Sequence, residues 1–339
     1  MVIESKKVIE NVLIDKALPS HDFLLELTDT VSALLENEIT DYRQEASDGN
    51  PGSLLDFQND DLPAIVVPDL HGRANFLLNI INYSLPKKFL GKSMSVYEAL
   101  EKGLVRLIFV GDILHTERNT KLRWILAQDD FLHENYTGPS ITEEMEESMA
   151  LWCGVFMLKL AFPKNCHVLK GNHENVYNST GGGDYAFKKY SNEGALVKAF
   201  VQEYYGDDIL YMIHCVETAL PLVVVGNNYV ISHAEPREPF TKEEIIDARL
   251  SARVVAGLTW TDNDEAEDGS VARVIKNLSV HDDISDYVYL GGHRCVKNTY
   301  EKRQGGLYIQ IHNPSKQNIS LIYRERKFNP EKDIVGVQK

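Results

Sequence analysis

The amino-acid sequence predicts a large α/β domain with mixed sheets. Short β-rich apolar runs alternate with helical stretches such as NFLLNIINYSL and EGALVKAFVQEYY, which is the pattern of an α/β fold. Two pairs of neighbouring runs late in the chain are expected to form hairpins, so the sheets should not be purely parallel. At 339 residues the chain is long enough to bury a large core.

The first part of the chain, residues 1–61, is expected to form a helical extension. Apolar residues recur there at helix spacing: Phe23, Leu24, Leu27, Val31, Leu34 and Leu35. The breaker cluster DGNPGS at 48–53 marks a boundary. The main domain is placed at 62–325, with an insertion or lid expected at 119–150 and a C-terminal tail at 326–339. The sequence leaves open whether the first helices pack on this domain or contact another chain.

Seven runs in the main domain are predicted to be strands. The first five are AIVVPD (64–69), RLIFVGD (106–112), HVLKGN (167–172), YVISH (229–233) and YVYLGGH (287–293). The segment PLVVV precedes YVISH and is joined to it by GNN, which is typical of a hairpin. The last two runs, LYIQI (307–311) and ISLIY (319–323), are expected to form a second hairpin.

Each of the first five runs ends in residues that can bind a metal: Asp69, His71, Asp112, Asn172, His233 and His293. In open α/β sheets, functional sites form beyond the carboxyl ends of the strands. Taken singly, Asp69 could cap a helix and His233 could be a hydrogen-bonded core residue. Five strand ends of the same kind are better explained by one shared site.

The chemistry of these side chains favours two divalent metal ions. Mixed imidazole, carboxylate and amide ligands suit Mn, Fe or Zn better than metals that prefer thiolates. The six residues are too many for one tetrahedral ion but fit two ions that share a carboxylate. Two ions about 3.5–4 Å apart can hold a hydroxide between them and neutralise a phosphoryl group for in-line attack.

The ordered motifs PDLHG, GDILH, GNHEN, ISH and GGH resemble those of the calcineurin-like metallophosphoesterases. Within them the chain resembles the phosphoprotein phosphatase family of Ser/Thr phosphatases and its bacterial relatives. The segments FPKNCHVLKGNHE and LTWTDN add to the resemblance, which covers roughly residues 62–325. It implies a four-layer αββα sandwich, in which two mixed sheets are flanked by helices.

The resemblance also implies roles for the motif residues. Asp69 and His71 would bind the first metal, and Asp112 would bridge both metals. The second metal would be bound by Asn172, His233 and His293. His173 would not be a ligand, and its place beside Asn172 suits a catalytic acid that protonates the leaving oxygen.

The chain differs from the family at the positions where the family usually has its phosphate-binding arginines. The family's second motif continues as aspartate and then arginine, whereas this chain has His115 and Thr116. Asn175 and Val176 stand where an arginine usually follows GNHE, and Pro68 replaces a common glycine. The aspartate orients the catalytic histidine in the family, so Glu174 or Glu117 is expected to take that part. His115 could be an extra ligand or a hydrogen-bond partner.

Four arginines near the motifs are candidates for binding substrate: Arg294, Arg118, Arg73 and Arg237. An arginine clamp binds phosphate through two parallel hydrogen bonds and positions it. For any single one of the four, a solvated surface role is the more common one. Arg294 is favoured as a substrate contact because it directly follows His293. The remaining histidines are expected to lie outside the site: His21, His133, His214, His281 and His312.

The expected function is therefore a metal-dependent phosphatase that hydrolyses phosphomonoesters, with phosphoserine or phosphothreonine as candidate substrates. The alternative is a phosphoanhydride or phosphodiester hydrolase, such as a dinucleoside polyphosphate hydrolase. A non-catalytic scaffold is disfavoured because no ligand is lost. The net charge of −15 argues against a broad nucleic-acid or anionic-membrane surface. The four scattered cysteines and the lack of a long apolar run favour a cytoplasmic protein.

Overall fold

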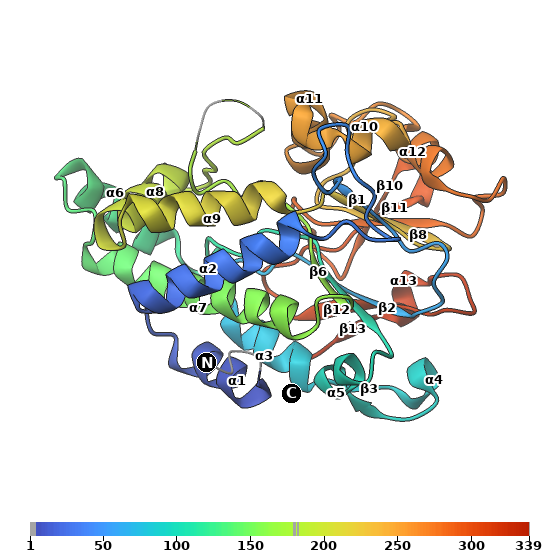
Figure 1. Ribbon diagram of the computed structural model, residues 1–339, viewed down its shortest axis with the longest axis horizontal. Coiled ribbons are helices and arrows are strands. Elements are labelled where there is room, and N and C mark those ends of the chain that lie inside the picture. The colour runs from blue at the N-terminus through green and yellow to red at the C-terminus, as the bar shows by residue number, and fades with distance from the viewer. Residues whose placement is uncertain (1–4, 179–180, 182, 339) are drawn as a thin grey trace.

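The structure, a computed structural model, describes residues 5–178, 181 and 183–338. Two sheets pack face to face, and helices cover the outer face of each sheet (Figure 1). Residues 1–4 of the predicted extension and residue 339 of the predicted tail lie outside the described residues. The expected sandwich of two mixed sheets flanked by helices is confirmed.

The larger sheet has six strands in the order β1-β7-β8-β9-β11-β10. Their bounds are β1 (Leu54–Asp56), β7 (Val223–Val225), β8 (Tyr229–Ser232), β9 (Val288–Gly291), β11 (Tyr308–Gln310) and β10 (Glu301–Arg303). The pairs β1–β7, β8–β9 and β9–β11 are parallel, whereas β7–β8 and β10–β11 are antiparallel. The expected hairpin of PLVVV and YVISH is thus confirmed.

The smaller sheet has five strands in the order β13-β12-β2-β5-β6. Their bounds are β13 (Ile334–Gly336), β12 (Asn318–Ile322), β2 (Ala64–Val67), β5 (Arg106–Phe109) and β6 (Cys166–Val168). The pairs β2–β5 and β5–β6 are parallel, and the other two pairs are antiparallel. A separate ribbon is formed by β3 (Ser84–Leu85) and β4 (Met94–Ser95).

The helices divide between the two outer faces (Figure 1). Those that contribute to the core on the five-stranded sheet are α1 (Lys6–Asp15), α2 (His21–Glu36), α3 (Ala74–Asn82), α4 (Lys87–Leu90), α5 (Val96–Glu101), α6 (Lys121–Leu132), α7 (Pro139–Ala161), α8 (Glu193–Tyr204) and α9 (Asp207–Ala219). The six-stranded sheet is covered by α10 (Lys242–Ile246), α11 (Ala252–Thr259) and α12 (Ser270–Leu278). A short helix, α13 (Pro330–Asp333), leads into β13.

The alternation of side chains along a strand explains the layers. In β2, Ile65 and Val67 face the helices, while Ala64 and Val66 join the core between the sheets. In β8, Val230 faces the helices that cover the six-stranded sheet, and Ile231 faces the five-stranded sheet. The central strands are therefore apolar on both faces, which is why they appear in the sequence as continuous hydrophobic runs.

The prediction of a second hairpin is wrong. LYIQI forms β11 beside β9 in the six-stranded sheet, and ISLIY forms β12 beside β2 in the five-stranded sheet. The connection between them crosses from one sheet to the other, and the Asn313 side chain anchors it by donating to the carbonyls of Val296 and Asn298. Two apolar runs joined by a short polar link look the same in sequence whether they pair or separate.

The predicted extension and tail contribute to the same cores and sheets as the main domain. Helices α1 and α2 pack against α7, α2 also packs against α9, and β1 and β13 complete the two sheets. The predicted lid, 119–150, consists of α6 and the first part of α7. The division of the chain at residues 61 and 325 stays a prediction. Among the described residues, no helix combines the length and apolar character needed to cross a bilayer.

A buried ion network joins the segment after α2 to the rest of the molecule. The Glu38 carboxylate accepts from Arg43 Nη1 at 2.8 Å and from Lys159 Nζ at 2.6 Å. Arg43 also donates to the carbonyls of Gly52 and Ala219. All three charged side chains are buried, so removing the single anion leaves two cations without their partner.

The substitution Glu38→Gln is expected to lower the free energy of unfolding by about 3–5 kcal/mol, because two buried positive charges lose their counter-charge. Urea denaturation followed by far-UV circular dichroism measures the change. The matched control is Glu26→Gln on the exposed face of α2, with an expected change within about 0.5 kcal/mol. Equal stability of the two variants would contradict the structural role of the network.

Candidate metal centre

The two sheets bring their strand ends together at one edge. Strands β2, β5 and β6 run parallel in one sheet, and β8, β9 and β11 run parallel in the other. Parallel strands present their carboxyl ends on the same side, so the loops that follow them converge. The six predicted ligands lie in these loops and are all buried: Asp69, His71, Asp112, Asn172, His233 and His293.

The predicted ligands form two adjoining groups. In the first, His71 Nε2 lies 3.9 Å from Asp69 Oδ2. In the second, the Asn172 side-chain oxygen lies 3.0 Å from His233 Nε2 and 2.8 Å from His293 Nδ1. The liganding atoms of Asp112, His233 and His293 all lie within 4.8 Å of one another.

Asp112 lies between the two groups. Its Oδ2 atom is 3.6 Å from His71 Nε2 and 3.3 Å from His233 Nε2. The same oxygen is 3.8 Å from His173 Nε2. One carboxylate therefore faces both groups and the predicted acid, which is the position that a bridging ligand requires.

Backbone groups hold these side chains in place. His71 Nδ1 donates to the carbonyl of His115 at 3.0 Å, and His233 Nδ1 donates to the carbonyl of Val110 at 3.0 Å. The backbone N–H of His293 donates to Asp69 Oδ2 at 2.8 Å, and that of His173 donates to Asp112 Oδ1 at 2.9 Å. His71 and His233 thus have Nδ1 committed to backbone carbonyls, and Asp69 and Asp112 each have one oxygen fixed.

The Glu174 side chain ties two of the loops together. Its carboxylate accepts from the backbone N–H groups of Asp112, Ile113 and Gly171, at 2.7–2.9 Å. This carboxylate, one of the two expected to orient His173, instead fixes the loop after β5 against the loop after β6. The other, Glu117, hydrogen-bonds to His312 and Lys189.

The loops are turned sharply at the candidate ligands. His71, Asp112, His115 and His293 have φ values of 44°, 52°, 75° and 63°, in the left-handed region that non-glycine residues rarely adopt. Gly292 makes a close approach possible, because a Cβ there would lie 1.7 Å from Asp69 Oδ1. Such strain and crowding concentrate at functional sites.

Burial and the neighbouring charges shift the pKa values of the candidate ligands in different directions. Burial lowers the pKa of His71 to about 4, so this ring is neutral and its Nε2 lone pair is free. Although burial opposes protonation, Asp112 raises the pKa of His233 to about 9. The pKa of Asp112 lies well below its usual range, because the surrounding histidines outweigh the effect of burial.

Several polar atoms at the centre lack a hydrogen-bond partner within the described part of the chain. They include Asp69 Oδ1, His71 Nε2 and His293 Nε2, all on buried side chains. Buried polar atoms in native structures nearly always have a partner. Carboxylate and imidazole atoms that converge without partners fit borderline divalent metal ions.

His173 is held among aromatic rings. The Phe187 ring stacks on it at 4.2 Å and 18°, and the His115 ring lies 4.8 Å away between centroids. His115 is fully buried, and its Nε2 lies 3.7 Å from Glu193 Oε1. Glu193 in turn accepts from the backbone N–H groups of Lys189 and Ser191. His115 thus lies beside His173, in the sequence position where the resembled family has an aspartate.

The four candidate arginines have different surroundings. Arg294 forms a two-hydrogen-bond ion pair with Asp262, at 2.8 and 2.7 Å, and Arg237 lies 3.8 Å from Glu265. Arg73 donates to backbone carbonyls, including those of Leu70 and Lys316. Arg118 is exposed and makes no hydrogen bond or ion pair with another described residue.

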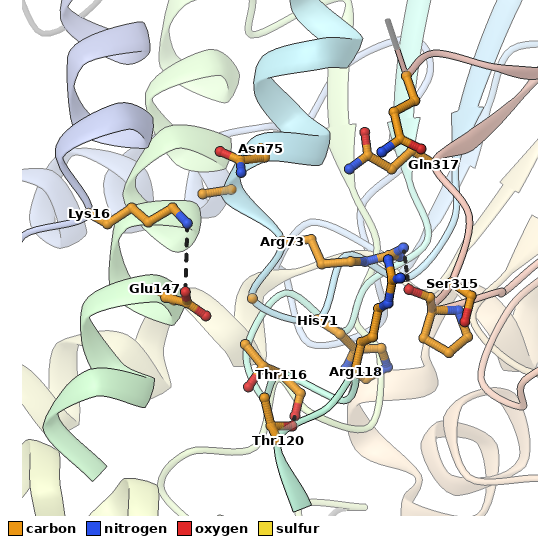
Figure 2. Close-up of a pocket in the computed structure, with 14 residues that line it drawn as sticks. Lys16, His71, Arg73, Asn75, Thr116, Arg118, Thr120, Glu147, Ser315 and Gln317 are labelled. Atoms are coloured by element: carbon orange, nitrogen blue, oxygen red, sulfur yellow. Dashed lines mark hydrogen bonds and ion pairs between the residues drawn. The ribbon is translucent and has the colours of Figure 1, made fainter. Parts of the chain in front are cut away.

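A cavity of about 220 Å³ opens beside the first group (Figure 2). His71, Arg73 and Arg118 line it, together with Thr116 and Ser315 from neighbouring loops. Two arginines that face one cavity make it attractive to anions in a chain whose net charge is negative.

Sequence reasoning missed His312, which was expected to lie outside the site. It directly follows β11, is fully buried, and has Nδ1 3.7 Å from Asp69 Oδ2. Its signal was present in the sequence, because the run LYIQI ends in a histidine just as YVISH does. Lys189 Nζ lies 2.5 Å from Glu117 Oε1, next to His312.

Comparisons with known proteins identify the fold. No family model and no curated protein matches the chain in sequence. The structure of a Saccharomyces cerevisiae protein serine/threonine phosphatase, described as similar to human phosphatase PP5, superimposes with a TM-score of 0.57 at 15% identity, covering 94% of this chain and 89% of that one.

Two weaker similarities have TM-scores below 0.5. A cold-active protein-tyrosine phosphatase of a psychrophilic Shewanella species gives 0.45 at 13% identity, covering 84% of this chain and 82% of that one. A putative diadenosine tetraphosphatase gives 0.41 at 14% identity, covering 80% and 92%. The layered sheets and the superposition on the yeast enzyme together show that this chain shares the fold of that phosphatase.

Proposed function

We propose that the protein is a dinuclear-metal-dependent phosphatase that hydrolyses phosphomonoesters, with phosphoserine or phosphothreonine as candidate substrates. The observation that carries this proposal is the convergence of partnerless carboxylate and imidazole atoms from both sheets at one edge. Asp69 and His71 would hold one ion, and Asn172, His233 and His293 the other, with Asp112 shared. Bound there, two divalent ions supply the Lewis acidity and positive charge that phosphoryl transfer needs.

His173 is assigned to protonate the leaving oxygen. Its ring is held by Phe187 and by His115, and its Nε2 lies 3.8 Å from Asp112 Oδ2. His115 and Glu193 together are proposed to replace the aspartate that orients the acid in the resembled family. Such an acid contributes about 10²–10⁴-fold to the rate, and most when the leaving group is a poor one.

The choice of monoesters rests on the cavity beside His71. Its lining includes Arg73 and Arg118, while Lys16 is paired with Glu147 of the same lining, and it has no tyrosine, phenylalanine or tryptophan among the described residues. A phosphomonoester presents a dianion, which such a lining attracts. A nucleoside base would instead need an aromatic or apolar slot, and Tyr136 of the predicted lid lines a different cavity. Arg118 is the candidate substrate contact, since the other three arginines are engaged with protein groups.

The protein reconstituted with Mn²⁺ is expected to release p-nitrophenol from p-nitrophenyl phosphate, and chelation should abolish this activity. Asp112→Asn should fall to the level of the chelated protein, because the shared ligand is weakened. If the fully metallated wild-type protein is inactive on monoesters but cleaves a dinucleoside polyphosphate, the monoester proposal is wrong and the phosphoanhydride alternative takes its place.

His173→Asn is expected to retain both metals and to lower kcat by about 10²–10⁴-fold for alkyl phosphates, with a smaller loss for p-nitrophenyl phosphate. The reason is that p-nitrophenolate leaves readily without a proton. His281→Asn, at an exposed histidine, serves as the control. An equal loss of kcat for substrates with good and with poor leaving groups would show that His173 is not the acid.

Gly292→Ala is expected to lower the metal content, because its Cβ would occupy the space of Asp69 Oδ1. The loss is measured as metal equivalents per chain by elemental analysis after desalting. Gly336→Ala is the control, since a Cβ there would lie 3.6 Å from its nearest neighbour. Full metal content in Gly292→Ala would show that Asp69 is not needed where the structure places it.

A further inference from the structure

His312 has a free nitrogen that faces the first group of candidate ligands. Its Nδ1 lies 3.7 Å from Asp69 Oδ2, and its ring centroid lies 5.0 Å from that of His71. Liganding atoms of Asp69, His71 and His312 all lie within 4.8 Å of one another. His312 is fully buried, and Nδ1 has no hydrogen-bond partner among the described residues.

The opposite nitrogen of the ring is already engaged. His312 Nε2 lies 3.1 Å from Glu117 Oε2, and a carboxylate can only accept, so the proton of the neutral ring is on Nε2. The lone pair is then on Nδ1, directed toward Asp69. Histidines that bind metals almost always donate their other N–H to a carboxylate or carbonyl. His71 and His233 follow the same rule here, through backbone carbonyls.

The Glu117 carboxylate is itself fixed in position. Lys189 Nζ lies 2.5 Å from Oε1, and the Cys295 thiol lies 3.4 Å from Oε2. The carboxylate and His312 are both buried, so their geometry is set by packing rather than by solvent. A chain of contacts therefore runs from Lys189 through Glu117 to His312.

We propose that His312 is a seventh protein ligand, which binds the first metal ion through Nδ1 beside Asp69, His71 and Asp112, and that Glu117 positions it. This inference rests on the proposed dinuclear centre. It gives the first ion two imidazoles and two carboxylates, where the motifs alone supply one imidazole. Such a mixed nitrogen and oxygen set favours Zn, Fe or Mn over Mg, which prefers oxygen ligands.

The competing explanation is that His312 only braces Glu117 against the loop after β11. Two substitutions separate the explanations, because the amide of Gln reaches about where Nε2 lies and the amide of Asn about where Nδ1 lies. His312→Gln keeps a partner for Glu117 but removes the nitrogen that faces Asp69. His312→Asn does the reverse. If His312 is a ligand, His312→Gln should weaken metal binding more than His312→Asn does. If His312 only supports Glu117, His312→Gln should weaken it less.

The experiment titrates metal-free, full-length protein with Co²⁺ and follows its visible absorption, with bound equivalents counted by elemental analysis. Wild-type protein should bind two equivalents. In His312→Gln one of the two should bind at least about tenfold more weakly, and Glu117→Gln should weaken the same equivalent by about 10–100-fold. The exposed control His281→Gln should match the wild-type protein in both affinities and spectrum.

Unchanged Co²⁺ affinities and spectrum in His312→Gln would overturn the proposal. If that variant does not fold, Glu117→Gln decides, and wild-type affinities there would likewise overturn it. Wild-type protein that binds two Co²⁺ ions but hydrolyses no phosphate ester would refute the proposed function alone. Wild-type protein that binds no Co²⁺ would refute both.

Discussion

The burial of two aspartates in the seam between the sheets is the constraint on which the site depends. An ionised carboxylate in a protein interior is costly unless positive charge and hydrogen bonds compensate it. Backbone N–H groups supply part of this compensation for Asp69 and Asp112, and a ring of histidines supplies more. The left-handed residues and the missing side chain at Gly292 follow from this constraint, because the loops must bring their backbone against the carboxylates.

Most of the candidate site could be predicted from the sequence, because the candidate ligands directly follow buried strands. A buried run followed by a ligand can be recognised one strand at a time, and that placed Asp112, His233 and His293 correctly at one edge. The pairing of strands is not local, so the run before His312 was expected to pair with ISLIY, whereas it pairs with β9. The parts that Glu174 and Glu117 take also needed three dimensions, since they depend on which donors lie within reach: the backbone N–H of Asp112 for Glu174, and the His312 ring for Glu117.

The loop after β5 shows how the chain departs from the family it resembles. Thr116, where that family carries an arginine, is bound through its backbone N–H to the buried carboxylate of Glu144 on α7 at 2.8 Å. Arg123 and Ser148 donate to the same carboxylate. The loop is thereby turned toward the helices. Under the proposed function, positive charge for the substrate would come from the neighbouring cavity, where Arg118 is the candidate contact.

The packing of α2 has a consequence for how the chain is made. Its apolar residues, Leu24, Leu27 and Val31, are covered by α7 and α9, and α9 ends only at Ala219. Because synthesis proceeds from the N-terminus, this face has neither partner until α7 (Pro139–Ala161) has been made, and its cover is complete only after α9 has followed. Exposed apolar surface of this kind is prone to aggregation. The order of synthesis therefore leaves an aggregation-prone apolar surface uncovered while most of the chain is still being made.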